Sequence, residues 1–207
     1  MLCTDLDLLK QEYNIYGGTT GPYPAQVLAK GNNGQVSGTT FLSTGQTFPA
    51  KEIAAGHVIY ISDGVGNIDG VFEIVSVDSS AQLTISVVRT DSTTNPIPAG
   101  TGLNLFYRIK TFGPQIKRTE FEISQLLGLK PGCPDGQYGL EDLQDQSVLK
   151  EAALFWTLSR IFAAMYGVEA SGENPTNYWN ALKEKRTLYQ ELAEIAIQRC
   201  KMSFTII

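Results

Sequence analysis

The sequence predicts an α+β protein, in which a helical domain is interrupted by an inserted small β-barrel or β-sandwich. Residues 21–113 contain 12 of the 20 glycines, 18 serines or threonines and only 11 charged residues. The equally long stretch 115–207 contains 6 glycines and 22 charged residues and carries long segments of helical periodicity. Such a shift in composition usually accompanies a change of architecture. We therefore expect a helical domain of residues 1–20 and 114–207 around a β domain of residues 21–113.

Length, charge and cysteine content limit the class of protein. A chain of 207 residues with 43% hydrophobic and 18% charged residues is typical of a globular protein with one sizeable core or two small ones. The net charge of -5 argues against a nucleic-acid-binding surface, which needs clustered Lys and Arg to displace counterions. Cys3, Cys133 and Cys200 are far apart and form no C-x-x-C pair. They favour a reducing compartment over a disulfide framework or a zinc site.

The N-terminal segment predicts a short helix and no targeting signal. Asp5 and Asp7 stand where a secretory signal would carry basic residues, and the chain has no run of 18 apolar residues that would predict a membrane span. Thr4 can cap a helix over the following segment, DLDLLKQEY.

Six short segments rich in β-branched and aromatic residues predict the β domain. They lie at residues 25–30, 38–43, 57–62, 70–77, 82–88 and 103–112, and turn-forming residues separate them. The alternation in the fourth segment places Phe72, Ile74 and, less clearly, Ser76 on one face of its strand. In the last segment Leu103, Leu105, Tyr107 and Ile109 share a face.

Three helices are expected after the β domain. Thr119 and Glu122 fit a capping box that would begin a short helix ending at Gly128. A long helix should start between residues 140 and 147 and end at Gly167. Asn174 as N-cap and Pro175 as first helical residue then predict an amphipathic helix to about Lys201. The connection between the two long helices is short, which favours an antiparallel helical hairpin.

The first long helix is apolar on almost every side. Between residues 152 and 166 only Thr157, Ser159 and Arg160 interrupt the apolar character, so the helix needs cover on two sides. A neighbouring subunit could supply part of that cover, and a core helix of a monomer is the other interpretation. The aromatic residues that suit a subunit interface are Phe155, Trp156, Phe162, Tyr166, Tyr178 and Tyr189.

No motif predicts a catalytic, cofactor or metal site. His57 is the only histidine and begins a predicted strand, which favours a structural or surface role. Cys133 lies in a Pro/Gly loop without a catalytic signature around it. Asp63, Asn67 and Asp69 suggest a calcium loop but lack the full spacing of one, and a wide hairpin turn accounts for them equally well. We therefore expect a non-enzymatic protein without a cofactor.

Three segments resemble the head–tail connector, or adaptor, proteins of tailed bacteriophages. They are CTDLDLLKQE at 3–12, LKEAALFWTLSRIFAAMYG at 149–167 and NYWNALKEKRTLYQELAEIAI at 177–197. The inserted β domain departs from the minimal all-helical members of that family.

The resemblance implies a structural virion protein in the phage neck, assembled in the host cytoplasm. Such proteins form homo-oligomeric rings, typically dodecamers, that join the portal protein to tail or neck proteins. Genomic DNA passes through the lumen without specific binding, and no membrane is involved. By this analogy an apolar C-terminal tail docks on the portal, and the residues concerned are Ser203, Phe204, Thr205, Ile206 and Ile207. A tail folded back on its own domain is the alternative for this segment. For the whole chain, the alternative is a glycan- or protein-binding β module attached to a helical oligomerisation domain.

Overall fold

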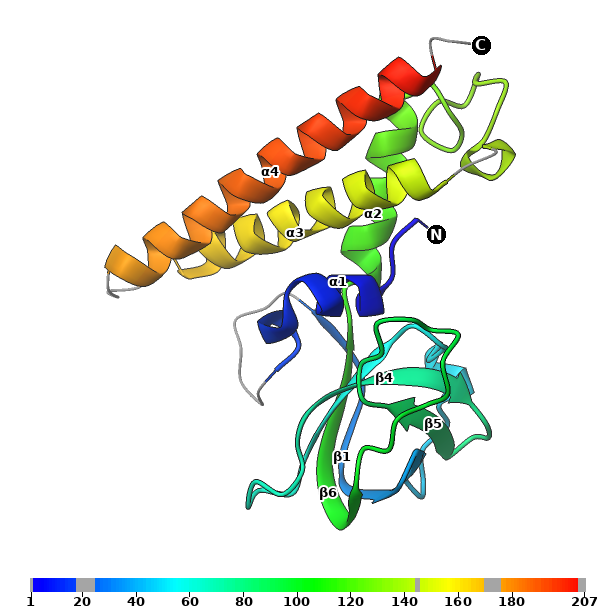
Figure 1. Cartoon of the computed structure of the whole chain (residues 1–207), viewed down its shortest axis with the longest axis vertical. Helices are drawn as coiled ribbons and strands as arrows, with labels where there is room; N and C mark the ends of the chain where they lie inside the picture. The colour runs from blue at the N-terminus through cyan, green and yellow to red at the C-terminus, as the bar shows by residue number, and fades with distance from the viewer. Residues whose placement is uncertain (1, 18–24, 144–145, 170–175, 205–207) are drawn as a thin grey trace. The chain divides into compact units, whose positions relative to one another are not determined.

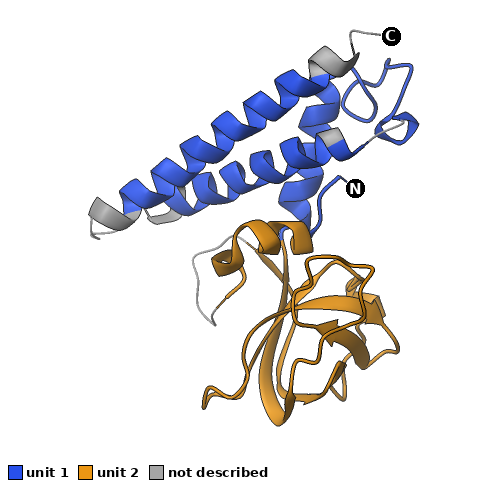
Figure 2. Cartoon of the chain, viewed as in Figure 1, with its two compact units in different colours: residues 1–4, 22–24, 112–207 blue, residues 5–21, 25–111 orange. Residues whose placement is uncertain are grey.

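The computed structural model describes residues 2–17, 25–143, 146–169 and 176–204. The chain forms two compact units, coloured separately in Figure 2. The helical unit comprises Met1–Thr4, Pro22–Pro24 and Phe112–Ile207, and the barrel unit comprises Asp5–Gly21 and Ala25–Thr111. The described residues contain four α-helices and six strands, so the predicted α+β class is confirmed.

The barrel unit contains a closed antiparallel barrel with the strand order β1-β2-β5-β4-β3-β6, in which β6 pairs with β1 (Figure 1). Each predicted strand segment overlaps one of its strands, and the barrel is the correct alternative of the two predicted. The strand β1 runs on to Ser37, well beyond the predicted segment. The strands are β1 Gln26–Ser37, β2 Thr40–Leu42, β3 Val58–Ser62, β4 Asp69–Val77, β5 Gln82–Ser86 and β6 Thr101–Thr111.

Aromatic and branched aliphatic side chains fill the barrel. The rings of Phe41 and Tyr107 meet edge to face with centroids 5.0 Å apart, and the Tyr107 hydroxyl lies 2.9 Å from the Oγ atom of buried Ser43. The fully buried members of this core include Phe48, Ile59, Ile61, Ile74, Leu83, Ile85, Leu105 and Ile109.

Two residues do not share the face of their strand that the sequence predicted for them. Leu103 is 68% exposed, because Asn104 adopts a left-handed conformation (φ 56°) that interrupts the alternation of β6. Ser76 does not continue the inner face of β4, because an irregularity in the β4–β5 register falls between Ile74 and Ser76. Val77 packs against the core instead.

The N-terminal helix α1 (Asp5–Gln11) belongs to the barrel unit, whereas the sequence placed it with the other helices. The Leu6 amide donates a hydrogen bond to the Gly56 carbonyl at 3.0 Å. The hydroxyl of Tyr13, in the 3-10 helix η1 (Tyr13–Ile15), accepts one from the Val71 amide at 3.0 Å. These long-range bonds tie α1 and η1 to the strands.

The helical unit contains α2 (Gly113–Leu126), α3 (Ser147–Glu169) and α4 (Thr176–Phe204). The predicted start of α2 was wrong: the helix begins at Gly113 with a proline in its first turn, so Thr119 is buried within the helix. The helix ends at Leu126, two residues before the predicted end, and Gly128 terminates it. Gly128 has φ 70°, and the Leu129 amide donates to the Ser124 carbonyl at 2.8 Å, as in a Schellman motif.

Aromatic rings pack α3 against α4. Tyr189 stacks on Phe162 with centroids 5.8 Å apart and on Phe155 at 5.9 Å, and Trp179 meets Tyr166 edge to face at 6.0 Å. The helix α4 continues to Phe204, so the backbone of residues 202–204 is helical and the helix runs past the predicted end at about Lys201. Thr205, Ile206 and Ile207 lie outside the described residues, as do Asn174 and Pro175.

Truncation of one buried side chain in the barrel core should have a large effect on stability. Ile61→Ala should lower the free energy of unfolding by about 2–5 kcal/mol, because it leaves a cavity at a fully buried position. Ile97→Ala is the matched control, since its side chain is 46% exposed and should contribute less than about 1 kcal/mol. Urea unfolding of both variants measures the difference, and equal losses would contradict the assignment of the core.

Candidate functional site

The only histidine helps to hold α1 on the barrel. Its Nδ1 atom accepts a hydrogen bond from the Ala54 amide at 3.0 Å, and its Nε2 atom lies 3.7 Å from the Asp5 carboxylate. Asp5 is buried and also accepts a hydrogen bond from the Tyr16 hydroxyl at 2.6 Å. Burial lowers the pKa of His57, and the carboxylate of Asp5 opposes that shift. The geometry fits the structural role that the sequence favoured.

The loop between β3 and β4 is organised around one carboxylate. Asp63 accepts hydrogen bonds from four backbone amides, at 2.8–3.3 Å, which belong to residues 65–68. Although partial desolvation opposes the shift, these donors hold the pKa of Asp63 below its ordinary value. Asp69 accepts a hydrogen bond from the Tyr60 hydroxyl at 2.6 Å. Within the described residues, no group of three or more His, Cys, Asp or Glu side chains is placed to hold a metal ion.

None of the three cysteines forms a disulfide bond. Cys3 and Cys200 are buried in the helical unit, and burial raises the pKa of the Cys200 thiol. Cys133 is half-buried. A raised pKa disfavours the reactive thiolate of Cys200.

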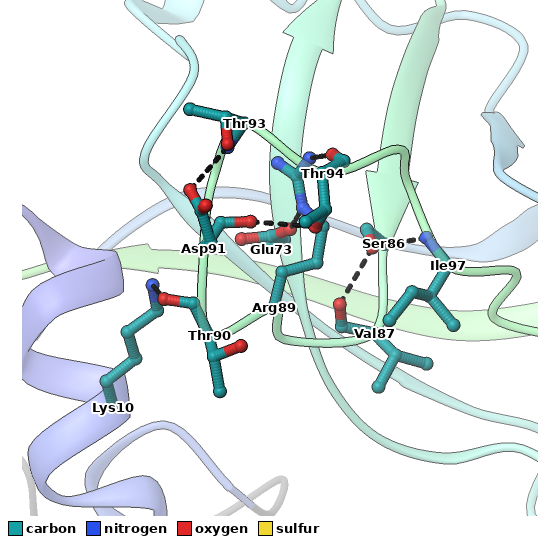
Figure 3. Close-up of polar contacts among 10 residues, drawn as sticks. All are labelled: Lys10, Glu73, Ser86, Val87, Arg89, Thr90, Asp91, Thr93, Thr94 and Ile97. Atoms are coloured by element: carbon teal, nitrogen blue, oxygen red, sulfur yellow. Dashed lines mark hydrogen bonds and ion pairs between the residues drawn. The ribbon is translucent and has the colours of Figure 1, made fainter.

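A buried ion pair anchors the loop between β5 and β6 (Figure 3). The Arg89 guanidinium pairs with Glu73 on β4 and donates to the Thr94 carbonyl within the loop. The Ser86 hydroxyl accepts a hydrogen bond from the Ile97 amide at 2.7 Å, and this bond closes the base of the loop. The sequence signal for this cluster was a glutamate inside an apolar strand, because a buried carboxylate needs a partner.

The helical unit has a groove of about 250 Å³ between α3 and α4. Small side chains and one tryptophan form its apolar surface, and charged side chains stand around it. Arg160 at the wall is paired with Glu122 of α2. The lining residues are Trp156, Ser159, Arg160 and Ala163 from α3, and Arg186, Gln190, Ala193 and Glu194 from α4.

The predicted interface aromatics occupy different places. Phe162 and Tyr189 are buried against each other inside the unit, and Phe155 and Tyr166 are half-buried against α4. Trp156 lines the groove. The side chains of Tyr178, Ser203 and Phe204 lie outside the described part of the structure.

Sequence reasoning missed the exposed apolar residues of this unit. Leu188 and Ile195 on α4 are each 50% exposed, and Phe121 and Leu126 on α2 are also exposed. The sequence does contain a signal for Leu188 and Ile195. They are apolar, lie seven positions apart, and have charged neighbours on the same side of a predicted helix.

Comparisons with family models, curated proteins and solved structures find no match to this chain. Among the helices as described, none combines the length and apolar character needed to span a bilayer.

Removal of the buried guanidinium should destabilise the barrel unit. Arg89→Ala leaves the buried Glu73 carboxylate without its counterion, so we expect the free energy of unfolding to fall by about 3–5 kcal/mol. Arg199→Ala is the matched control, because Arg199 pairs with Glu151 at 3.9 Å on the surface and should contribute at most about 1 kcal/mol. Urea unfolding of both variants is the measurement, and an Arg89→Ala protein as stable as the control would refute the role of the pair.

Stability should depend on pH through His57. Because folding holds the pKa of His57 below its ordinary value of 6.5, the unfolded chain takes up the proton first as the pH falls. The free energy of unfolding should therefore decrease as the pH falls through 6.5 towards the pKa of the folded state. His57→Gln should remove this decrease, which urea titrations across the window would measure. Identical pH slopes in the two proteins would show that another group is responsible.

Proposed function

We propose that this chain is a structural head–tail adaptor of a tailed bacteriophage, which forms a homo-oligomeric ring between portal and tail around the DNA channel. One observation carries the proposal: apolar side chains stay exposed on α2 and α4 after the long helices have packed. Leu188 and Ile195 lie two turns apart on one side of α4, and an exposed apolar strip of this kind suits contact with another protein. The residues are Phe121, Leu126, Leu188 and Ile195.

The contacts between α3 and α4 support an antiparallel hairpin as the building block of such a ring. Glu151 near the start of α3 lies 3.9 Å from Arg199 near the end of α4. Further along, Ser159 donates to the Arg186 carbonyl at 3.2 Å, and Tyr166 meets Trp179. A hairpin locked along its length offers two rigid flanks to neighbouring copies.

The charge of the chain suits a channel for DNA. A net charge of -5 on each copy gives an assembled ring a large negative charge, which repels the phosphate backbone and disfavours sticking to the wall. The role needs neither a cofactor nor a membrane. The ring is proposed to lie in the virion neck, where it also meets tail or neck proteins.

The proposed ring can be tested with the purified chain. Light scattering backed by negative-stain images, with and without portal protein, should detect a ring or a monomer that becomes a ring on meeting the portal. A monomer that ignores the portal would overturn the proposal. The closed barrel would then be the place to search for a glycan or protein ligand.

The C-terminal residues 203–207 are proposed to dock on the portal. Their removal should weaken portal binding at least about tenfold, which corresponds to about 1.4 kcal/mol, while the ring and its thermal stability persist. Ile206→Val and Ile207→Val, which keep the apolar character, are the controls and should bind as the full chain does. Biolayer interferometry measures portal binding by each variant. Full affinity in the truncated chain would show that residues 203–207 do not dock on the portal.

A further inference from the structure

The exposed side of α4 carries apolar side chains beside charged ones, and Leu188 lines a shallow hollow there together with Lys183, Glu184 and Glu191. Leu188 and Ile195 are both half-exposed and lie two turns apart on one side of the helix. Glu184 and Glu191 lie three or four positions from Leu188 and share that side. Neither glutamate has an ion-pair partner among the described residues. We call these four residues the ridge.

The groove between α3 and α4 has the complementary character. Ser159, Ala163 and Ala193 are small, so their helices leave a hollow next to the ring of Trp156. Arg186 stands at its rim, and its guanidinium has no partner in the described part of the chain. The Nε atom of Arg160 in the wall also has no hydrogen-bond partner there. Glu194 at the rim is already engaged, because it accepts a hydrogen bond from Gln190 at 3.1 Å.

Helix geometry places the ridge and the groove on different flanks of the unit. Two positions along an α-helix correspond to a rotation of about 200°. Gln190 of the groove follows Leu188 of the ridge by two positions, and Ala193 precedes Ile195 by two. One copy therefore cannot place its ridge in its own groove, but it can use both surfaces on two neighbours.

We propose that the ridge of one copy inserts into the groove of the next copy. Leu188 and Ile195 pack against Trp156 and Ala163 of the neighbour, while Glu184 and Glu191 pair with Arg186. This inference rests on the proposed ring and names its subunit contact. A head-to-tail contact of this kind closes into a ring when its rotation divides a full turn.

The charges select this contact over a ridge-to-ridge dimer. A symmetric pairing of two ridges would bring together two carboxylates, Glu184 and Glu191, and one ammonium group, Lys183, from each copy. Each face then carries a net negative charge, so the pairing costs electrostatic energy. Insertion into the groove gives these carboxylates an unpaired guanidinium instead. The occupant that the groove fits best is therefore a second copy of the same chain.

The test uses variants with a defect on one side only. Leu188→Asp damages the ridge and leaves the groove, and Ala163→Trp fills the groove and leaves the ridge. Each alone should lose ring formation in sedimentation velocity experiments, with association weakened at least about tenfold. An equimolar mixture of the two should form a heterodimer but no ring, because only one intact interface exists between them. Leu103→Asp on the barrel is the control and should assemble as the unmodified chain does.

A charge exchange separates the contact from a folding defect. Arg186→Glu should abolish assembly, and adding Glu191→Arg in the same chain should restore it, because every interface then carries the reversed pair. Circular dichroism melts monitor folding throughout. Rings formed equally well by Leu188→Asp and Arg186→Glu would overturn the contact and leave the ring intact. A wild-type chain that stays monomeric with and without portal would overturn both. A dimer that Leu188→Asp disrupts and Arg186→Glu does not would identify a ridge-to-ridge pair instead.

Discussion

The stacking of Tyr189 on Phe155 and Phe162 fixes how α4 is rotated about its own axis, and the surface of the helical unit depends on that rotation. Phe155 and Phe162 are seven positions apart and share one side of α3, so a single tyrosine can engage both. Once Tyr189 faces α3, its neighbours Leu188 and Gln190 must turn about 100° to either side. The exposed ridge and the groove are consequences of this one aromatic contact.

The barrel could be predicted well from the sequence, because strand alternation and turn residues are local signals. The errors arose where a local conformation broke the alternation, as at Asn104, whose positive φ sends Leu103 outward. The predicted start of α2 was wrong for a different reason. Glu122 matches a capping pattern with Thr119, but its carboxylate pairs with Arg160 from another helix, and no short sequence window contains that partner.

The candidate site was only partly predictable, since residue type does not specify which side of a helix meets which neighbour. The apolar character of α3 correctly indicated a need for cover, yet the aromatic residues expected at an interface include Phe162 and Tyr189, which are buried within the unit. Leu188 could have been found from its spacing to Ile195. The groove could not have been predicted from the sequence, because it arises where the small residues Ala163 and Ala193 of two helices meet.

The two units use some of their charged residues differently, and this contrast motivates the proposed contact between copies. In the barrel unit Arg89 forms a buried ion pair with Glu73, and the carboxylate of Asp63 accepts hydrogen bonds from amides of its own loop. On α4, by contrast, Glu184, Arg186 and Glu191 keep unpaired charges beside exposed apolar side chains. Opposite charges placed on opposite flanks of one rigid element cannot neutralise each other within a copy. They can do so between copies arranged head to tail, and a closed ring is the arrangement that leaves no flank unsatisfied.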